Sequence, residues 1–137
     1  MSGASLSKSE IKDLVGKLGA LPRFADCSKK DLEVLAKSAA LSSVPTNWPL
    51  INDQTPADAC YVILDGEVAI VVDHHPVARL GAGSVVGEVG LFEPRLRNAD
   101  VVTVTRVTVL HLVAEVFQNL VTSYPAIRTA LQCPAAA

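Results

Sequence analysis

The residues with the clearest chemical potential lie between positions 81 and 100, where glycines surround one acid and one arginine. The glycines stand at positions 81, 83, 87 and 90, where they permit positive φ angles or close approach of the backbone. Residues 88–92 are long enough for about one helical turn. A short turn after glycine exposes unpaired N–H groups at the positive end of a helical dipole. The segment therefore predicts an anion site, whose usual occupant is a phosphate.

Glu88 and Arg97 are the two charged side chains that fit such a site. They are nine residues apart across a loop that carries Pro94, so a folded-back loop would bring both to one pocket. A guanidinium pairs with a phosphate in a charge-assisted, often bidentate geometry. An ionised carboxylate is only an acceptor, which suits a sugar hydroxyl. The alternative is an ordinary surface ion pair worth ~0–1 kcal/mol, but the glycine spacing favours a ligand.

The elements that position this segment are short strands. From position 41 onward, runs of Val, Ile and Leu alternate with turns rich in Gly, Pro and Asp. The clearest strands are predicted at residues 60–64, 67–72, 77–80, 101–105 and 107–112. We interpret them as an antiparallel meander that closes into a β-roll, because closure removes exposed sheet edges.

Helical periodicity flanks the strands on both sides. Ser7 and Glu10 have the spacing of a capping box before one amphipathic helix, and Ser28 is placed to cap a second. After the strands, helical spacing runs from Val113 to Val121, and a short helix at 127–131 precedes a frayed tail. The predicted fold is α+β, an antiparallel, jelly-roll-like β-roll with helices at both ends. One domain spans 1–137: helices in 1–40, the roll in 41–112 with the cassette at 81–100, and helices in 113–132.

Bulk properties exclude several functions. The 137 residues carry a formal charge of -2, whereas a nucleic-acid module usually has a strongly basic face. No apolar run approaches the ~20 residues of a membrane span, and the amino terminus does not resemble a signal peptide. The three cysteines show no CxxC spacing. We expect a cytoplasmic protein that contacts neither nucleic acid nor membrane.

Catalysis and metal binding are not indicated either. His74 and His75 are adjacent, so in a strand they would point to opposite faces, and a hairpin tip is the favoured interpretation. His111 lies in an apolar run with no nucleophile partner, which is typical of a packing residue. We therefore expect no catalytic residue, no metal and no cofactor.

Residues 87–91 (GEVGL) followed by 97–99 (RNA) resemble the phosphate-binding cassette of the cyclic-nucleotide-binding domain family. That family includes the bacterial catabolite activator protein and the regulatory subunits of cAMP-dependent kinase. The resemblance runs from about residue 21 to 131. It includes residues 61–68 (YVILDGEV), similar to the family's strand-Gly-strand signature, and residues 80–88 (LGAGSVVGE).

The resemblance implies roles for individual residues. Glu88 would bind the ribose 2′-hydroxyl and Arg97 the exocyclic phosphate. Besides Gly87, main-chain N–H groups near Val89, Gly90 and Asn98 or Ala99 would complete the cradle. Apolar strand residues that include Val71 and Val86 would contact the base.

The sequence also departs from the family pattern. Asn98 leaves cAMP, the favoured ligand, and cGMP both open. Asp100 brings a carboxylate near the phosphate site, although strand alternation points it away from Arg97. Gln54 and Thr55 replace a Gly-acid pair, and few residues remain after position 131 to cap the base.

Two functions remain open. The first is a stand-alone receptor that binds a cyclic nucleotide and signals to an unidentified effector protein. The second is a degenerate member of the family that acts as a nucleotide-independent protein-interaction module. Direct DNA binding would need a helix-turn-helix for which the chain has no room. A symmetric homodimer is the commonest assembly of soluble proteins, although the sequence shows no long dimerising helix.

Overall fold

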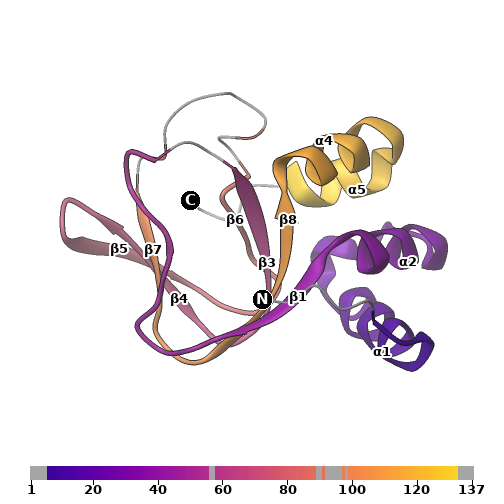
Figure 1. Cartoon of the computed structure of the whole chain (residues 1–137), viewed down its shortest axis with the longest axis horizontal. Coiled ribbons are helices and arrows are strands. Elements are labelled where there is room, and N and C mark those ends of the chain that lie inside the picture. Colours follow the sequence, from indigo (N-terminus) through magenta and orange to yellow (C-terminus); the bar gives the residue numbers. More distant parts are fainter. Residues whose placement is uncertain (1–5, 56–57, 89–90, 92–96, 98, 133–137) are drawn as a thin grey trace.

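Helices gather on one side of a β-roll (Figure 1). The structure is a computed structural model that describes residues 6–55, 58–88, 91, 97 and 99–132. The helices are α1 (Lys8–Gly19), the 3-10 helix η1 (Pro22–Phe24), α2 (Lys29–Ser38), α4 (Ala114–Ser123) and α5 (Pro125–Gln132). The strands are β1 (Ala40–Val44), β2 (Pro49–Ile51), β3 (Ala59–Asp65), β4 (Val68–Val72), β5 (His75–Leu80), β6 (Val85–Val86), β7 (Asp100–Thr103) and β8 (Val107–Val113).

Both predicted N-terminal caps are present. The Ser7 hydroxyl accepts from the Glu10 amide at 3.1 Å, and the Glu10 carboxylate accepts from the Ser7 amide at 2.8 Å. Ser28 and Asp31 make the same reciprocal pair at 3.0 Å in both directions. Each box satisfies two backbone donors that a helix start leaves without intrahelical partners. The first two helices therefore begin where the sequence predicts.

The strands form two four-stranded antiparallel sheets, with the orders β1-β8-β3-β6 and β2-β7-β4-β5. The β-roll prediction is confirmed, but the meander prediction is wrong. Among the strands that the structure describes, β4 and β5 are the one consecutive pair that is also hydrogen-bonded. The last strand, β8, lies between β1 and β3. It is buried on both faces, with Leu110 and Leu112 in a cluster that includes the helices and Val107 and Val109 in a cluster inside the roll.

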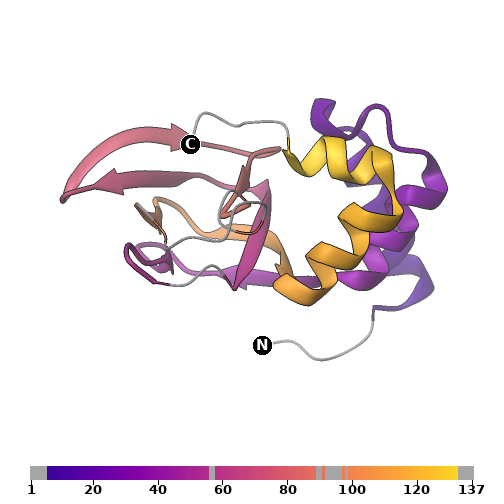
Figure 2. The ribbon, with the colours of Figure 1, turned by 90° about the horizontal axis from the view of Figure 1, so that it is seen from above.

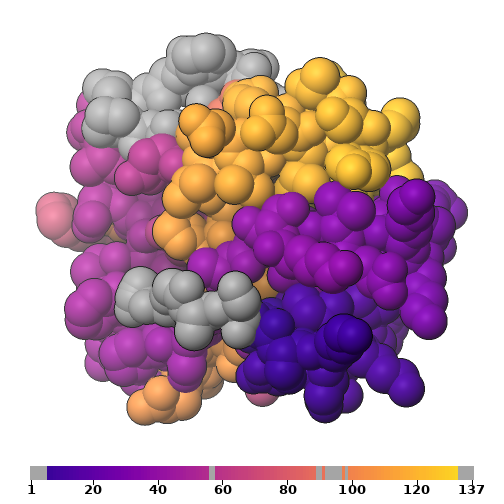
Figure 3. All heavy atoms as spheres, turned by 45° about the vertical axis from the view of Figure 1, so that its right-hand side comes forward, coloured from indigo at the N-terminus to yellow at the C-terminus, as the bar shows by residue number. Residues whose placement is uncertain are grey.

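Two clusters of buried side chains hold the layers together. The helix-side cluster joins α1, α2, α4 and α5 to the outer face of the first sheet, with Phe24, Phe117 and Leu110 at most 1% exposed. The interior cluster fills the space between the two sheets, and Ile63, Val68 and Val109 are central to it. Figure 2 shows the helices stacked on the same side of the roll from above, and Figure 3 shows α1 and α2 beside the C-terminal helices.

The hairpin tip between β4 and β5 and the junction of β8 with α4 both bear on the sequence predictions. Asp73 and His74 have φ angles of 50° and 66° at the tip between β4 and β5, which confirms the hairpin tip, although His75 belongs to β5. Val113 ends β8 and is 46% exposed, so its assignment to the C-terminal helix is wrong. Val113 has an extended backbone and is the N-cap residue that immediately precedes α4. The predicted frayed tail lies outside the described residues.

Candidate functional site

Arg97 is buried and is held by backbone carbonyls at the start of β3 and just after β6. Its Nη1 donates to the Gly87 carbonyl at 2.6 Å and its Nη2 to the Ala59 carbonyl at 2.5 Å. Its own amide donates to the Thr55 carbonyl, and its carbonyl accepts from the Gln54 amide, both at 2.8 Å. A hydrogen bond from a charged donor is stronger than a neutral one, especially out of water. The guanidinium is therefore fixed beside β3 and the end of β6.

Gly87 is the residue on which this arrangement depends most directly. Its φ is +88°, a conformation that side chains rarely adopt. A Cβ there would lie 2.9 Å from Arg97 Nη1, 2.9 Å from Ile51 Cδ1 and 3.1 Å from the Ala59 carbonyl oxygen. Glycine is required both for the turn after β6 and for the approach of the guanidinium.

Glu88 is also buried, at 4% exposed, and its carbonyl accepts from the Leu91 amide at 3.0 Å. Burial raises the pKa of the Cys60 thiol well above its ordinary value. The charge of Glu88 raises this pKa further, and that of Arg97 lowers it. Both charged groups thus lie near one buried thiol on β3. The structure brings Glu88 and Arg97 together, while their roles toward a ligand stay predictions.

Asp58 is a neighbour of Arg97 that the sequence did not single out. Its carboxylate oxygen lies 3.8 Å from Arg97 Nη2, and its side chain is 88% exposed against 6% for Arg97. Burial raises the pKa of the nearby Tyr61 hydroxyl; Asp58 raises it further and Arg97 lowers it. No local motif marks Asp58, because 39 positions separate it from its partner.

The residues around the predicted cradle fall into three groups. Ala99 is half-buried and packs against the interior cluster. The Asp100 carboxylate accepts from the Asp53 amide at 2.6 Å, so it holds the loop after β2. Val89, Gly90 and Asn98 lie outside the described residues.

The two valines predicted to contact a base lie on different faces. Val86 is 1% exposed and belongs to the interior cluster. Along β4, however, Val68 and Ile70 are buried in that cluster while Ala69 and Val71 alternate to the other face. The wall of the roll's interior beside β6 is instead formed by apolar residues that sequence reasoning missed: Ile51, Ile70, Ala78 and Leu80. The run 68–72 is apolar throughout, so its inward face could not be recognised from hydropathy.

Two hydrogen bonds of α4 reach segments that lie near Arg97. Gln118 Nε2 on α4 donates to the Leu91 carbonyl at 2.8 Å. The amide of Ala114, the first residue of α4, donates to the Asp58 carbonyl at 2.9 Å. Leu91 itself is 6% exposed and belongs to the helix-side cluster. A displacement of Leu91 or Asp58 would therefore change the hydrogen bonds of α4.

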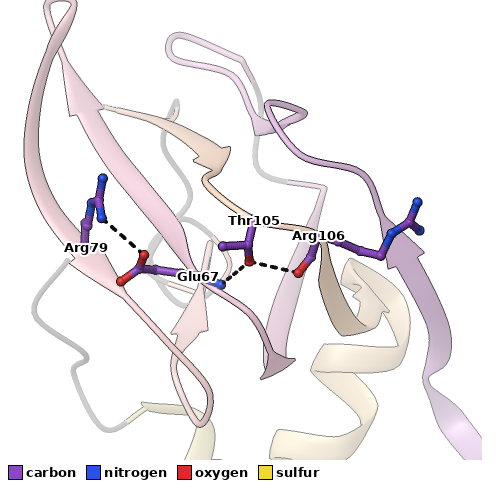
Figure 4. A network of polar contacts seen from close by, with 4 residues as sticks. All are labelled: Glu67, Arg79, Thr105 and Arg106. Carbon is purple, nitrogen blue, oxygen red and sulfur yellow. Dashed lines mark hydrogen bonds and ion pairs between the residues drawn. The ribbon is translucent and has the colours of Figure 1, made fainter.

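The strand-Gly-strand segment has its own reason for glycine. Gly66 has φ +93°, and a Cβ would collide with the Arg106 carbonyl oxygen and lie 2.7 Å from Val107 Cγ1. Beside it, the Glu67 amide donates to Thr105 Oγ1 at 3.1 Å, and Glu67 pairs with Arg79 at 3.3 Å (Figure 4). These contacts fix the turn between β3 and β4 against the loop before β8, away from Arg97.

The histidines do not assemble a metal site. Within the described ranges, no group of three His, Cys, Asp or Glu side chains has metal-binding geometry. His75 Nδ1 lies 2.8 Å from the Asp73 carbonyl oxygen at the hairpin tip. His111 stacks on Tyr61, with ring centroids 5.0 Å apart and an interplanar angle of 11°. Nor does any helix in the described part of the chain have the length and apolar character needed to cross a bilayer.

Comparison with known sequences identifies relatives of this chain. The chain is 29% identical over 112 residues to an uncharacterized NTE family protein of Mycobacterium tuberculosis, which covers 81% of this chain and 19% of the relative. It is 31% identical over 110 residues to a cyclic nucleotide-gated potassium channel of Rhizobium etli, covering 80% of this chain and 31% of the channel. The chain thus spans about a fifth to a third of these relatives' length.

Comparison with solved structures gives the same fold. The regulatory domain of Toxoplasma gondii PKA, solved with cAMP, matches with a TM-score of 0.71 and 20% identity over 84% of this chain and 46% of that one. The family model described as the cyclic nucleotide-binding domain matches residues 41–124, which comprise the roll, the cassette and α4. This chain therefore belongs to the cyclic nucleotide-binding domain family.

Proposed function

We propose that the protein is a receptor for a cyclic nucleotide, with cAMP as the favoured ligand and cGMP as the competitor to test. The observation that carries the proposal is the pair of buried charges, Glu88 and Arg97, at the end of β6. A buried arginine held by two carbonyls keeps its geometry without a ligand, so little ordering cost remains for binding. The resemblance to cAMP-bound and nucleotide-gated relatives supports the choice of ligand.

Each part of the ligand has a matching group. Arg97 supplies the positive charge for the cyclic phosphate, and Glu88 accepts from the ribose 2′-hydroxyl. The base would lie against the inward apolar wall beside Val86, formed by residues such as Ile70 and Leu80. We favour this wall over Val71, because Val71 is on the opposite face of β4.

The signal would leave the site through α4. Ligand contacts near Glu88 would bias the position of Leu91, whose carbonyl is bonded to Gln118 and whose side chain packs in the helix-side cluster. A ligand that favours one arrangement shifts the population toward it. We propose that a partner protein in the cytoplasm recognises the helices in that arrangement. The family is regulatory, and we propose that this chain has no catalytic activity of its own.

The test is ligand binding to the wild-type chain and to Arg97 variants. Thermal melting and calorimetry with cAMP, cGMP and 5′-AMP should show stabilisation by one or both cyclic nucleotides, and a ligand at ~100 times its Kd adds about 2.7 kcal/mol. Arg97→Ala should weaken binding by at least about 30-fold, because the phosphate loses a buried counter-charge. Arg97→Lys keeps the positive charge but loses the planar, bidentate geometry of the guanidinium. Arg106→Ala removes an exposed arginine and is the matched control.

One observation favours a second candidate function. Both terminal nitrogens of Arg97 already have backbone acceptors, and Asp58 lies beside them. A chain that no longer binds nucleotide would act as a protein-interaction module, with a partner that binds equally with and without cAMP. The absence of any thermal shift at millimolar cyclic nucleotide, with wild-type folding, would decide for this alternative.

A further inference from the structure

In the described part of the chain, the buried Arg97 guanidinium forms an ion pair with the carboxylate of Asp58. This carboxylate lies 3.8 Å from Arg97 Nη2, too far for a hydrogen bond but close enough for a direct charge interaction. Because Asp58 is 88% exposed and Arg97 only 6%, the carboxylate lies on the solvent side of the guanidinium. An anion that reaches Arg97 from solvent approaches the same region.

The main chain and the side chain of this segment have separate tasks. The Asp58 carbonyl accepts from the Ala114 amide at the start of α4, and the next carbonyl, of Ala59, accepts from Arg97. Both bonds are independent of the Asp58 side chain. The carboxylate has no such structural partner in the described contacts and contributes chiefly its charge.

We propose that Asp58 is an affinity-setting residue of the site: its carboxylate competes with the anionic group of a ligand for Arg97. The inference rests on the proposed function, because it concerns how tightly the same site holds a cyclic phosphate. A phosphate bound at Arg97 must either displace the Asp58 carboxylate or lie beside a like charge. Either event lowers affinity, and Asp58 thereby raises the ligand concentration at which the receptor responds.

The size of the effect follows from the distance and the exposure. Two unit charges about 4 Å apart interact weakly in bulk water and more strongly near a protein surface, and solvent screening reduces the effect for an exposed carboxylate. Removing the charge should tighten binding by about threefold to tenfold at low ionic strength. The gain should shrink in about 1 M salt, where the Debye length is only about 3 Å.

The experiment compares Asp58→Asn with Asp65→Asn in the full chain. Both changes remove one exposed carboxylate and alter the net charge equally, but Asp65 lies at the far end of β3, about 20 Å from Asp58 along an extended chain. The Kd of cAMP is measured by calorimetry at low and high salt for the wild type and both variants. In parallel, the melting temperature of each protein is followed against inorganic phosphate.

The expected result is a threefold to tenfold lower Kd for Asp58→Asn at low salt, a smaller gain at high salt, and no change for Asp65→Asn. Equal affinity of the two variants, or weaker binding by Asp58→Asn, overturns the inference while leaving the proposed function standing. If no variant binds a cyclic nucleotide, the proposed function fails, and phosphate decides the inference. Greater stabilisation of Asp58→Asn than of Asp65→Asn by phosphate then supports the inference, and equal stabilisation overturns it.

Discussion

Gly87→Ala should be far more damaging than the same change at Gly83, although both glycines have nearly the same φ angle. Their φ angles are +88° and +92°. At Gly83 a Cβ meets only Leu21 Cδ2, at an ordinary contact distance of 3.5 Å. At Gly87 it meets Arg97 Nη1 and Ile51 Cδ1 at 2.9 Å and the Ala59 carbonyl oxygen at 3.1 Å. The pair therefore separates backbone strain from loss of the arginine's position.

The two costs can be estimated separately. Placing alanine at a left-handed φ costs about 1–2 kcal/mol in the free energy of unfolding, and this applies to both variants. At Gly87 the Cβ also displaces Arg97 from its bond to the Gly87 carbonyl, and a hydrogen bond from a charged group is worth about 1.5–3 kcal/mol. Gly87→Ala should thus be less stable than Gly83→Ala by about 1.5–3 kcal/mol.

Urea denaturation and thermal melting of the two variants measure this difference directly. For a domain of this size, about 1.5–3 kcal/mol corresponds to a gap of roughly 5–12 °C in the melting temperature. Gly87→Ala should also weaken cAMP binding by more than tenfold, because the guanidinium no longer holds its place, while Gly83→Ala should leave the Kd nearly unchanged. Gly16→Ala, in a helix and without a neighbour within 4 Å of the added Cβ, should be neutral or slightly stabilising.

Equal stability of the Gly87→Ala and Gly83→Ala variants would contradict this prediction. The prediction would also be refuted if Gly87→Ala lost stability as expected but bound cAMP as tightly as the wild type. In the first case the arginine would not depend on the missing side chain. In the second, Arg97 would not be the group that holds the ligand.

Two further predictions concern buried polar groups. Because burial keeps the Cys60 thiol protonated in the folded state while it ionises near pH 8.5 when unfolded, its contribution to stability is complete below about pH 8.5 and is lost as pH rises above it. Cys60→Ala should lower stability at pH 7 but flatten the decline toward pH 10.5 in urea titrations; an unchanged slope would contradict this. Thr103 Oγ1 donates to the Pro45 carbonyl at 2.6 Å and accepts from the Trp48 amide at 2.8 Å, so Thr103→Val should cost about 1–3 kcal/mol. Thr108→Val, on the partly exposed β8 position, is the control and should change stability by less than about 0.5 kcal/mol.

The features that the sequence predicts well are those set by neighbouring residues. The capping boxes at Ser7 and Ser28 depend on partners three positions away, and both are present. The hairpin tip at Asp73 is equally local. By contrast, pairing of β1 with β8 joins residues about 70 positions apart, for which hydropathy carries no signal. The short strands β2 and β6 contain three and two residues, too few for any periodicity.

In the site, too, local features could be predicted and contacts between distant residues could not. Glu88 and Arg97 were found because glycines and charges lie close together in the chain. The groups that fix Arg97 are backbone carbonyls of Gly87 and Ala59, and any residue can supply a carbonyl. The inward face of β4 was misjudged because Ala69, Val71 and Ile70 are all apolar, so only the folded sheets show which of them face the interior.

The placement of β8 in the first sheet also bears on how the chain reaches its fold. β8 is the last strand in sequence, yet it lies between β1 and β3 and completes the hydrogen bonding of both. Until residue 113 has been synthesised, β1 lacks the partner it has in this sheet and β3 has only the short β6, so strand edges remain open to other chains. Such distant pairings slow folding, because the loop must close before its contacts form. A chain interrupted before β8 would therefore be prone to aggregate. It would also lack the pairing of Ala59 with Val113, which holds in place the carbonyl that accepts from Arg97.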